Sequence, residues 1–376
     1  MNPPAIKKKR LFPGRHAIFA ILLSCVLLLG CGDSDADSEN PGSAMSKPPV
    51  PGTLDLRLVL PDASAVLGMQ VAKVLEQEGM KPFVVVLQET IYRQQELKFQ
   101  DFQQVVMVMP PAKDKQRPNQ SAVIFTLKEG ASTDAAGLIK ELSRGQPVES
   151  SRYNGQTLQL TKHGAFCRLN DRTVVVAKES ELKWLLDSQS QEGQGPAWLA
   201  SAKSLTGMDG FFAYDASEVS EQMLNMPLGR TNPMQMFAPF WLEPVTVVGG
   251  MTLTGKLSYK VIANCRDKKG AEKLVNTVDS LIPLGRNMLD GAKTQLEKVP
   301  LRNKEGAEMQ ATIIGMADDL LTNLKVQQNG TEVTVSTSTN TDVGKTLVAA
   351  LMPAVMQARE AKSEQKQPQA DRHRHS

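Results

Sequence analysis

A pattern of predicted strands and helices that occurs twice along the chain constrains its fold more than any other feature of the sequence. Residues 104–109 (QVVMVM) and 245–253 (VTVVGGMTL) are predicted strands, because short apolar runs bounded by polar turns are typical of buried strands. Residues 122–142 and 259–278 each predict a strand, a polar turn and an amphipathic helix. Equivalent segments lie roughly 137 to 159 residues apart. The pattern predicts an α+β protein made of two tandem repeats, each an antiparallel sheet packed by helices.

The beginning and the end of each repeat follow the same logic. Residues 54–60 alternate and predict a strand, after which Asp62 or Ser64 caps a helix with Val66, Leu67, Val71, Val74 and Leu75 at helical spacing. In the second pass an apolar run from Phe211 leads into a helix at Asp215, so PDAS (61–64) and YDAS (214–217) are assigned the same role. Late strands at 170–177 and 329–336 each precede a short helix, at 179–188 and 341–351.

These elements divide the chain into five predicted parts. They are a lipoprotein signal peptide (1–30), a lipidated cysteine with a disordered tether (31–53), the first repeat (54–188), the second repeat (196–350), and a helix end with a charged tail (351–376). The tether is rich in Ser, Asp, Pro and Gly and has little to bury. Residues 189–195 (QSQEGQG) form the predicted joint between the repeats.

The N-terminal residues have the order of an export signal. Five basic residues precede an apolar run from Ala17 to Gly30, which is shorter than the roughly 20 residues that span a bilayer. Leu28-Leu29-Gly30-Cys31 resembles the lipobox of bacterial lipoproteins. The resemblance implies that Cys31 is acylated, palmitate included, and anchors the protein in the inner or outer membrane of the cell envelope. A permanent membrane helix is the alternative interpretation of the same run.

Charge argues against a nucleic-acid partner. The leader carries five of the 43 Lys and Arg residues and no acidic residue, which leaves 38 basic against 40 acidic residues and a net charge of −2 in the mature chain. Phosphate binding requires a concentrated basic surface. We therefore expect the membrane and a protein as partners, and no nucleic acid.

No motif in the sequence predicts an active site. After the leader the histidines are His163, His373 and His375, and no HExxH, CxxC or phosphate-binding loop occurs. The adjacent carboxylates Asp318 and Asp319 point to different sides of a helix and are expected to face solvent. We expect no enzyme, no cofactor and no metal. Cys167 and Cys265 remain as thiols that form a disulfide or stay separate and buried.

A methionine-rich segment, residues 223–241, stands out as a candidate contact surface. Met-rich apolar stretches form adaptable contact surfaces. The alternative is a lid that folds back on the second sheet. The candidate partner-contact residues are Met223, Met226, Met234, Met236, Phe237, Phe240 and Trp241.

The C-terminal segment carries a family resemblance. Pro353-Ala354-Val355 and Ala358-Arg359-Glu360-Ala361 resemble the PAVQAAREAAR motif of planctomycete pseudopilin-like proteins, and the two-unit layout is similar to exported lipoproteins of that group. The position of the motif at the far end of the chain does not predict a pilus subunit.

Together these features predict an envelope lipoprotein that acts as a non-enzymatic interaction or structural module. A carrier or sensor that holds an apolar ligand between sheet and helices is the alternative.

Overall fold

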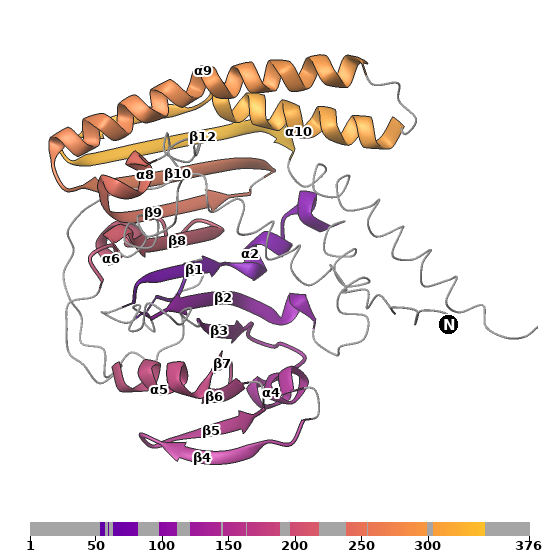
Figure 1. Cartoon of the computed structure of the whole chain (residues 1–376). Helices are drawn as coiled ribbons and strands as arrows, with labels where there is room; N and C mark the ends of the chain where they lie inside the picture. The colour runs from indigo at the N-terminus through magenta and orange to yellow at the C-terminus, as the bar shows by residue number, and fades with distance from the viewer. Residues whose placement is uncertain are drawn as a thin grey trace, which may run out of the picture.

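The structure is a computed structural model, and it contains one large antiparallel sheet with helices on both faces (Figure 1). It describes residues 53–56, 59, 63–81, 98–110, 121–143, 146–162, 164–188, 196–217, 238–253, 255–298 and 304–342. The α+β class predicted from the sequence is confirmed. The number of sheets differs from the prediction, since the twelve strands belong to one sheet.

The strands are β1 (Ala65–Met69), β2 (Phe102–Met109), β3 (Ala122–Leu127), β4 (Glu149–Tyr153), β5 (Gln156–Thr161), β6 (Gly164–Asn170), β7 (Thr173–Ala177), β8 (Gly210–Asp215), β9 (Pro244–Thr252), β10 (Lys256–Cys265), β11 (Lys325–Asn329) and β12 (Glu332–Asp342). Their order across the sheet is β11-β12-β10-β9-β8-β1-β2-β3-β7-β6-β5-β4. The α-helices are α2 (Val71–Leu75), α4 (Ala135–Ser143), α5 (Glu179–Ser188), α6 (Leu199–Lys203), α8 (Pro239–Leu242), α9 (Lys268–Lys298) and α10 (Lys304–Thr322). Short 3-10 turns are η2 (Glu78–Met80) and η3 (Phe99–Asp101).

The two predicted sheets merge where β1 and β8 pair. Ala65 lies opposite Tyr214 and Met69 lies opposite Gly210 in this antiparallel pair. The N–H of Asp215 donates to the carbonyl of Ser64 at 2.8 Å. PDAS and YDAS therefore do not have the same role, because PDAS precedes β1 whereas YDAS includes the end of β8. They are neighbours in space.

The start of the first unit is the part of the secondary structure that the sequence predicted wrongly. Val66 and Leu67, expected in a helix, lie in β1, which pairs with β2 and β8 on its two sides. In the predicted strand 54–60, the structure describes residues 54–56 and 59 and gives them no strand. Pairing on both edges outweighs the helical spacing of these side chains, since β-structure depends strongly on context.

Most of the other predicted elements are confirmed. The strands expected within 104–109, 122–142, 245–253 and 259–278 are β2, β3, β9 and β10, and the helix at 179–188 is α5. The two late strands correspond to β7 and β12. The joint at 189–195 and the segment from 343 onward, which includes the predicted C-terminal helix and its PAV motif, lie outside the described residues.

The two faces of the sheet bury different sets of side chains. Face A, defined by Val66, Val106, Ile124 and Val175, packs against α5, α6 and the segment around Leu54. Face B carries the alternate residues of the same strands. It is covered by α4 over β6 and β7 and by α9 over β10 and β12. Near the end of β1, α2 packs on face B with Met80 and Leu257.

Face A becomes polar toward β12. In this strand Val333 and Val335 are buried on face B, whereas Thr334, Ser336 and Ser338 are half-buried on face A. Ser336 pairs with Lys260, which is exposed. The alternation of apolar and hydroxyl side chains is typical of an antiparallel sheet with one solvated face.

Candidate functional site: an exposed helical arm

The last two helices form an arm that extends beyond the sheet. In α9, Ala271, Leu274 and Val278 are buried in the core with Val333 and Val335. From residue 281 onward no described side chain of α9 is buried, and the same holds for residues 310–322 of α10. Figure 1 shows both helices continuing past the ends of β9 and β10. We call residues 281–298 and 304–316 the arm.

Polar contacts fix α10 to β12 at the base of the arm. The hydroxyl of Thr337 donates to the carbonyl of Leu320 at 2.5 Å, and Asn323 Nδ2 donates to the carbonyl of Ser338 at 2.8 Å. Asp319 Oδ2 accepts the backbone N–H of Asn340 at 2.8 Å. Asp319, which the sequence places facing solvent, is half-buried and binds the backbone of β12 from the surface of the arm's base.

Close packing joins the two helices of the arm to each other. At Gly285 an added Cβ would lie 2.9 Å from Leu321 Cδ1, so a larger residue there would require the Leu321 side chain to shift. Lys293 Nζ lies 2.9 Å from Asp318 Oδ2, and the Asp318 side chain is 45% exposed, so this carboxylate faces solvent and also pairs with a lysine. The hydrogen bond with Asp318 raises the pKa of Lys293 above its usual value.

Large apolar side chains of the arm face solvent. Leu284 is 38% exposed, Met288 69% and Ile313 47%. Outside the arm, exposed large apolar side chains in the described part of the chain are Val148 (41%) and Val245 (37%), which stand singly. Leu284 and Met288 are four residues apart and therefore lie on one side of α9. A cluster of this kind marks a contact surface more often than scattered residues do.

The charges on the arm are mixed in sign. From residue 281 to the end of α10, the two helices carry the basic residues Arg286, Lys293, Lys298 and Lys304 and the acidic residues Asp290, Glu297, Glu305, Glu308, Asp318 and Asp319. Asp318 and Asp319 lie at the base, so the arm itself has four basic and four acidic residues and no net charge. It is thus not a basic surface for an anionic partner.

Most of the methionine-rich segment that the sequence predicts as a contact surface is not among the described residues. Met223, Met226, Met234, Met236 and Phe237 are outside the described residues. Phe240 and Trp241 belong to α8 and are half-buried, and Phe240 packs against the core under α9. Glu243, directly after α8, pairs with Lys273 of α9 at 2.7 Å. These two aromatic residues therefore act as part of a packed layer.

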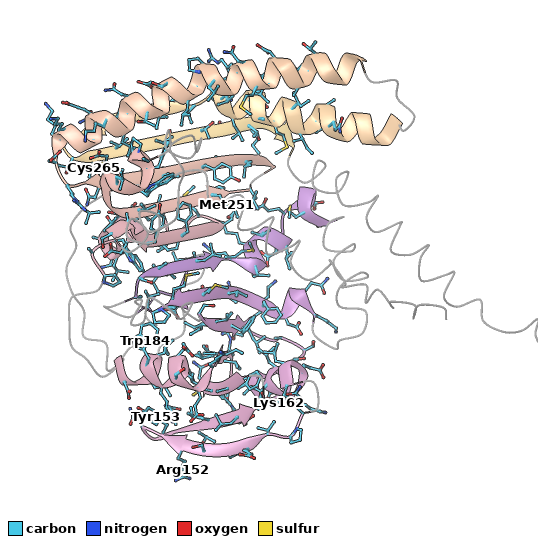
Figure 2. All side chains as sticks on the ribbon, in the orientation of Figure 1. Arg152, Tyr153, Lys162, Trp184, Met251 and Cys265 are labelled. Atoms are coloured by element: carbon cyan, nitrogen blue, oxygen red, sulfur yellow. The ribbon has the colours of Figure 1, made fainter. Side chains whose placement is uncertain are left out.

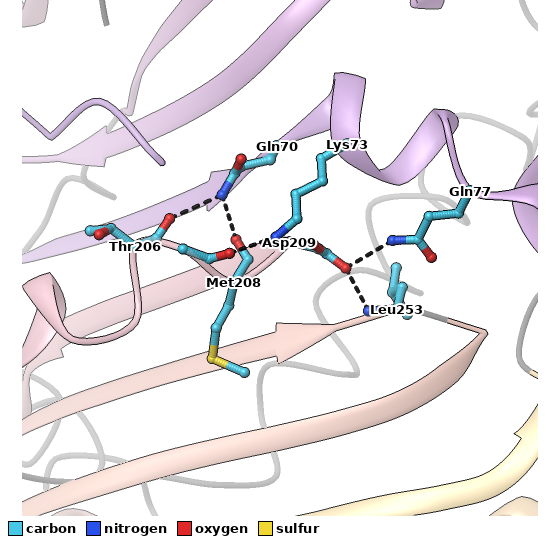
Figure 3. Close-up of polar contacts among 8 residues, drawn as sticks. Gln70, Lys73, Gln77, Thr206, Met208, Asp209 and Leu253 are labelled. Atoms are coloured by element: carbon cyan, nitrogen blue, oxygen red, sulfur yellow. Dashed lines mark hydrogen bonds and ion pairs between the residues drawn. The ribbon is translucent and has the colours of Figure 1, made fainter. Parts of the chain in front are cut away.

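A buried carboxylate joins the two halves of the sheet near the end of β1 (Figure 3). The side chain of Asp209 is fully buried, and its Oδ1 lies 2.9 Å from Lys73 Nζ. Its Oδ2 accepts the N–H of Leu253 at 2.6 Å and Gln77 Nε2 at 3.0 Å. Gln70 Nε2 donates to the carbonyls of Thr206 and Met208 at 3.0 and 2.8 Å. Because both carboxylate oxygens are in contact with donors from α2 and β9, the cluster holds the halves together.

A second polar cluster connects α5 with the turn between β4 and β5. The hydroxyl of Tyr153 donates to Asp187, with 2.9 and 2.7 Å to its two oxygens, and Asn154 Nδ2 donates to Oδ1 at 2.7 Å. Lys183 Nζ lies 5.1 Å from the centre of the Tyr153 ring. The hydrogen bond with Asp187 raises the pKa of Tyr153. Figure 2 shows Tyr153 and Trp184 at this end of the sheet, where the contacts anchor the helix.

The remaining thiols are not poised for chemistry. Cys167 and Cys265 are both free and buried, each in a different core. Burial raises the pKa of Cys167 to about 11. Burial and then the charges of Glu243 and Asp267 raise the pKa of Cys265 to about 12. Both thiols are therefore protonated at neutral pH and are poor nucleophiles.

Other sequence-predicted positions lie outside the described residues, among them the expected lipidation site Cys31 and His163. Among the described residues, no group of three or more His, Cys, Asp or Glu side chains is arranged to hold a metal ion. None of the described helices is both long enough and apolar enough to cross a bilayer.

Comparisons with known proteins find similarity of fold only at a low level. No known protein family matches the chain, and no curated protein is similar to it in sequence. The chain is similar to crystal form III of TP0453, at 11% identity over 78% of this chain and 96% of that chain with a TM-score of 0.39. Crystal form IV of TP0453 gives 12% identity, coverage of 80% and 96%, and a TM-score of 0.41. A similarity of this size supports no conclusion about function.

Proposed function

We propose that this protein is an envelope-anchored lipoprotein that works without catalysis, as an interaction or structural module. Acylated Cys31 holds it at the membrane, and the arm provides its contact surface. The observation that carries the proposal is the exposure of Leu284, Met288 and Ile313 on one projecting pair of helices. Single exposed apolar side chains are ordinary on protein surfaces, whereas several of them on one projecting pair of helices are typical of a contact surface.

The proposal includes a duplicated body. In the first half the strand order runs β1-β2-β3-β7-β6, and in the second half it runs β8-β9-β10-β12-β11, with a helix after the third strand in both. β4 and β5 are extra strands between that helix and the last pair of the first half. This correspondence supports descent of both halves from one unit, with the arm as an elongation of the helix in the second.

Carriage of an apolar ligand is the second candidate, and a different observation favours it. A row of paired residues crosses face B from Val123 through Met107 and Leu67 to Phe212. These side chains are half-buried, and the row lies between the core under α4 and the core under α9. An acyl chain is the ligand that a long apolar row of this kind would accommodate.

Site-specific photo-crosslinking in cells tests the leading proposal. A photoreactive amino acid at position 288 of the lipidated protein should give a defined adduct, whereas the same group at Val148, which is exposed but stands alone, should give none. Replacing Cys31 with Ser should abolish acyl labelling and release the protein from the membrane fraction.

The outcomes separate the parts of the proposal. Absence of any adduct at positions 284, 288 and 313 would refute the arm as the contact surface. Retained acyl labelling of the Cys31→Ser chain would refute the anchor. A stoichiometric, non-covalent lipid in the purified protein, with no adduct at the arm, would establish the carrier instead.

A further inference from the structure

We infer that the occupant of the arm's apolar surface is the lipid surface itself, so that the protein touches the membrane at a second place besides its anchor. This inference rests on the proposed function and names the partner of the same site. It is argued from the side chains of the arm, the length of the tether, and the charge of the arm.

The first argument is the chemistry of the exposed side chains. Leu284, Met288 and Ile313 are exposed aliphatic side chains on two neighbouring helices. Leu284 and Met288, four residues apart, share one side of α9, and Arg286, Asn287 and Asp290 on the same helix are exposed polar residues. A helix with one apolar side and one polar side can lie in the plane of a bilayer with its apolar side buried roughly 5–10 Å deep. The arm can do so without unfolding, because none of its described side chains is buried.

The second argument is the reach of the tether. The first described residue is Thr53, which is 22 residues after Cys31. A chain of that length extends to at most about 75 Å and has a root-mean-square reach of about 25 Å. Leu54 is fixed to the body, since its N–H donates to the carbonyl of Thr206 at 3.0 Å. An anchored body is therefore confined near lipid, where a weak second contact is favoured by high local concentration.

The third argument concerns the kind of lipid contact. The arm has four basic and four acidic residues, and its net charge of zero provides no attraction to anionic headgroups. The contact must therefore depend on burial of apolar side chains, which salt does not screen. This distinguishes the arm from a basic amphipathic helix, whose binding requires anionic lipid and weakens in salt.

Flotation with lipid vesicles tests the inference. The protein is the full mature chain from residue 31 with Cys31→Ser, so that no acyl group contributes, and the vesicles are of phosphatidylcholine alone. We expect the chain to float with the vesicles, equally well in about 1 M salt, where the screening length is ~3 Å. Replacing both Leu284 and Met288 with Gln, which preserves helix propensity, should weaken the association by about tenfold or more.

A matched control uses apolar residues of similar exposure outside the arm. The chain with Val148→Gln and Val245→Gln should float as the unsubstituted chain does. Circular dichroism and thermal unfolding check that both double variants fold. Sedimentation without lipid checks whether the arm instead pairs with a second copy of the chain.

Several outcomes would overturn the inference. The unlipidated chain would fail to float, or the arm variant would float as well as the unsubstituted chain. Alternatively, binding would require anionic lipid, or the chain would form a dimer that only the arm substitutions dissociate. The proposed function is judged separately: protein adducts and no lipid adducts at position 288 would leave it standing while refuting the lipid contact.

Discussion

The two halves of the sheet share a strand order but differ in how they are covered. From β1 to β6, both faces are packed, with α5 and α6 on face A and α4 on face B. From β10 to β11, α9 and α10 cover face B, and face A is lined by Thr334, Ser336 and Ser338. The outer strands β12 and β11 therefore have a core on face B alone, whereas Ala213, Val248 and Ile262 of β8, β9 and β10 still belong to the core on face A. The helices of the second half are long enough to continue beyond the sheet. Halves with the same strand order can thus have both faces covered, or have outer strands with one covered face and helices that project beyond the sheet.

Substitutions on face A, one in each half, should show the largest difference in the free energy of unfolding. Ile124 in β3 is 2% exposed on face A, and Ile124→Ala should lower the free energy of unfolding by about 2–5 kcal/mol through lost burial and a cavity. Ser336→Ala on the same face of β12 should change it by no more than about 0.5 kcal/mol. Urea unfolding of both variants measures the contrast. Equal losses would mean that face A is closed over β12 as well.

A glycine in the second half, one strand away from the junction, should have a smaller effect on the free energy of unfolding. At Gly249 in β9 an added Cβ would overlap the ring of Phe212 on the neighbouring strand. Gly249→Ala should therefore cost about 1–3 kcal/mol, because the ring must leave its position. Thermal and urea unfolding check this value.

A glycine of the arm provides the control for that prediction. An added Cβ at Gly291 in α9 meets no atom within 4 Å, so Gly291→Ala should stabilise the protein, by up to about 1 kcal/mol from helix propensity. The double variant Phe212→Ala with Gly249→Ala should lose less than the sum of the single losses, since the clash is then absent. A loss in the double variant equal to the sum of the two single losses would contradict the contact between Gly249 and Phe212.

The smallest predicted effect concerns the two cysteines. Both thiols should react with a thiol reagent far more slowly in the folded protein than in the unfolded chain. Cys265 should react before Cys167, because the core around Cys265 is covered only by the helices on face B. Since burial raises both pKa values, ionisation is easier in the unfolded chain. The thiols' contribution to the free energy of unfolding should therefore be constant below about pH 8 and fall above it, and replacing both with Ser should reduce this fall. Labelling kinetics followed by mass spectrometry measure the order, and faster labelling of Cys167 would reverse the comparison.

Part of this structure was accessible from local sequence patterns. The apolar runs of β2 and β9, and the strand–turn–helix order of β3 with α4 and of β10 with α9, depend on side chains close together in the chain. The exposed arm also has a local signal, because Leu281, Leu284 and Met288 follow one another at the three- and four-residue spacing of a helix. That signal predicts a helix, but it does not tell where the sheet beneath the helix ends.

The sequence by itself determined the α+β class, whereas the export signal and the anchor at Cys31 stay predictions. Only the tertiary structure decided that β1 pairs with β8 to join both halves, that Asp209 is buried at their junction, and that the arm extends beyond the sheet. The physical reason is the same in each case. Strand partners, burial and exposure are set by residues more than a hundred positions away, as in the pairing of Leu67 with Phe212, and no local pattern contains that information.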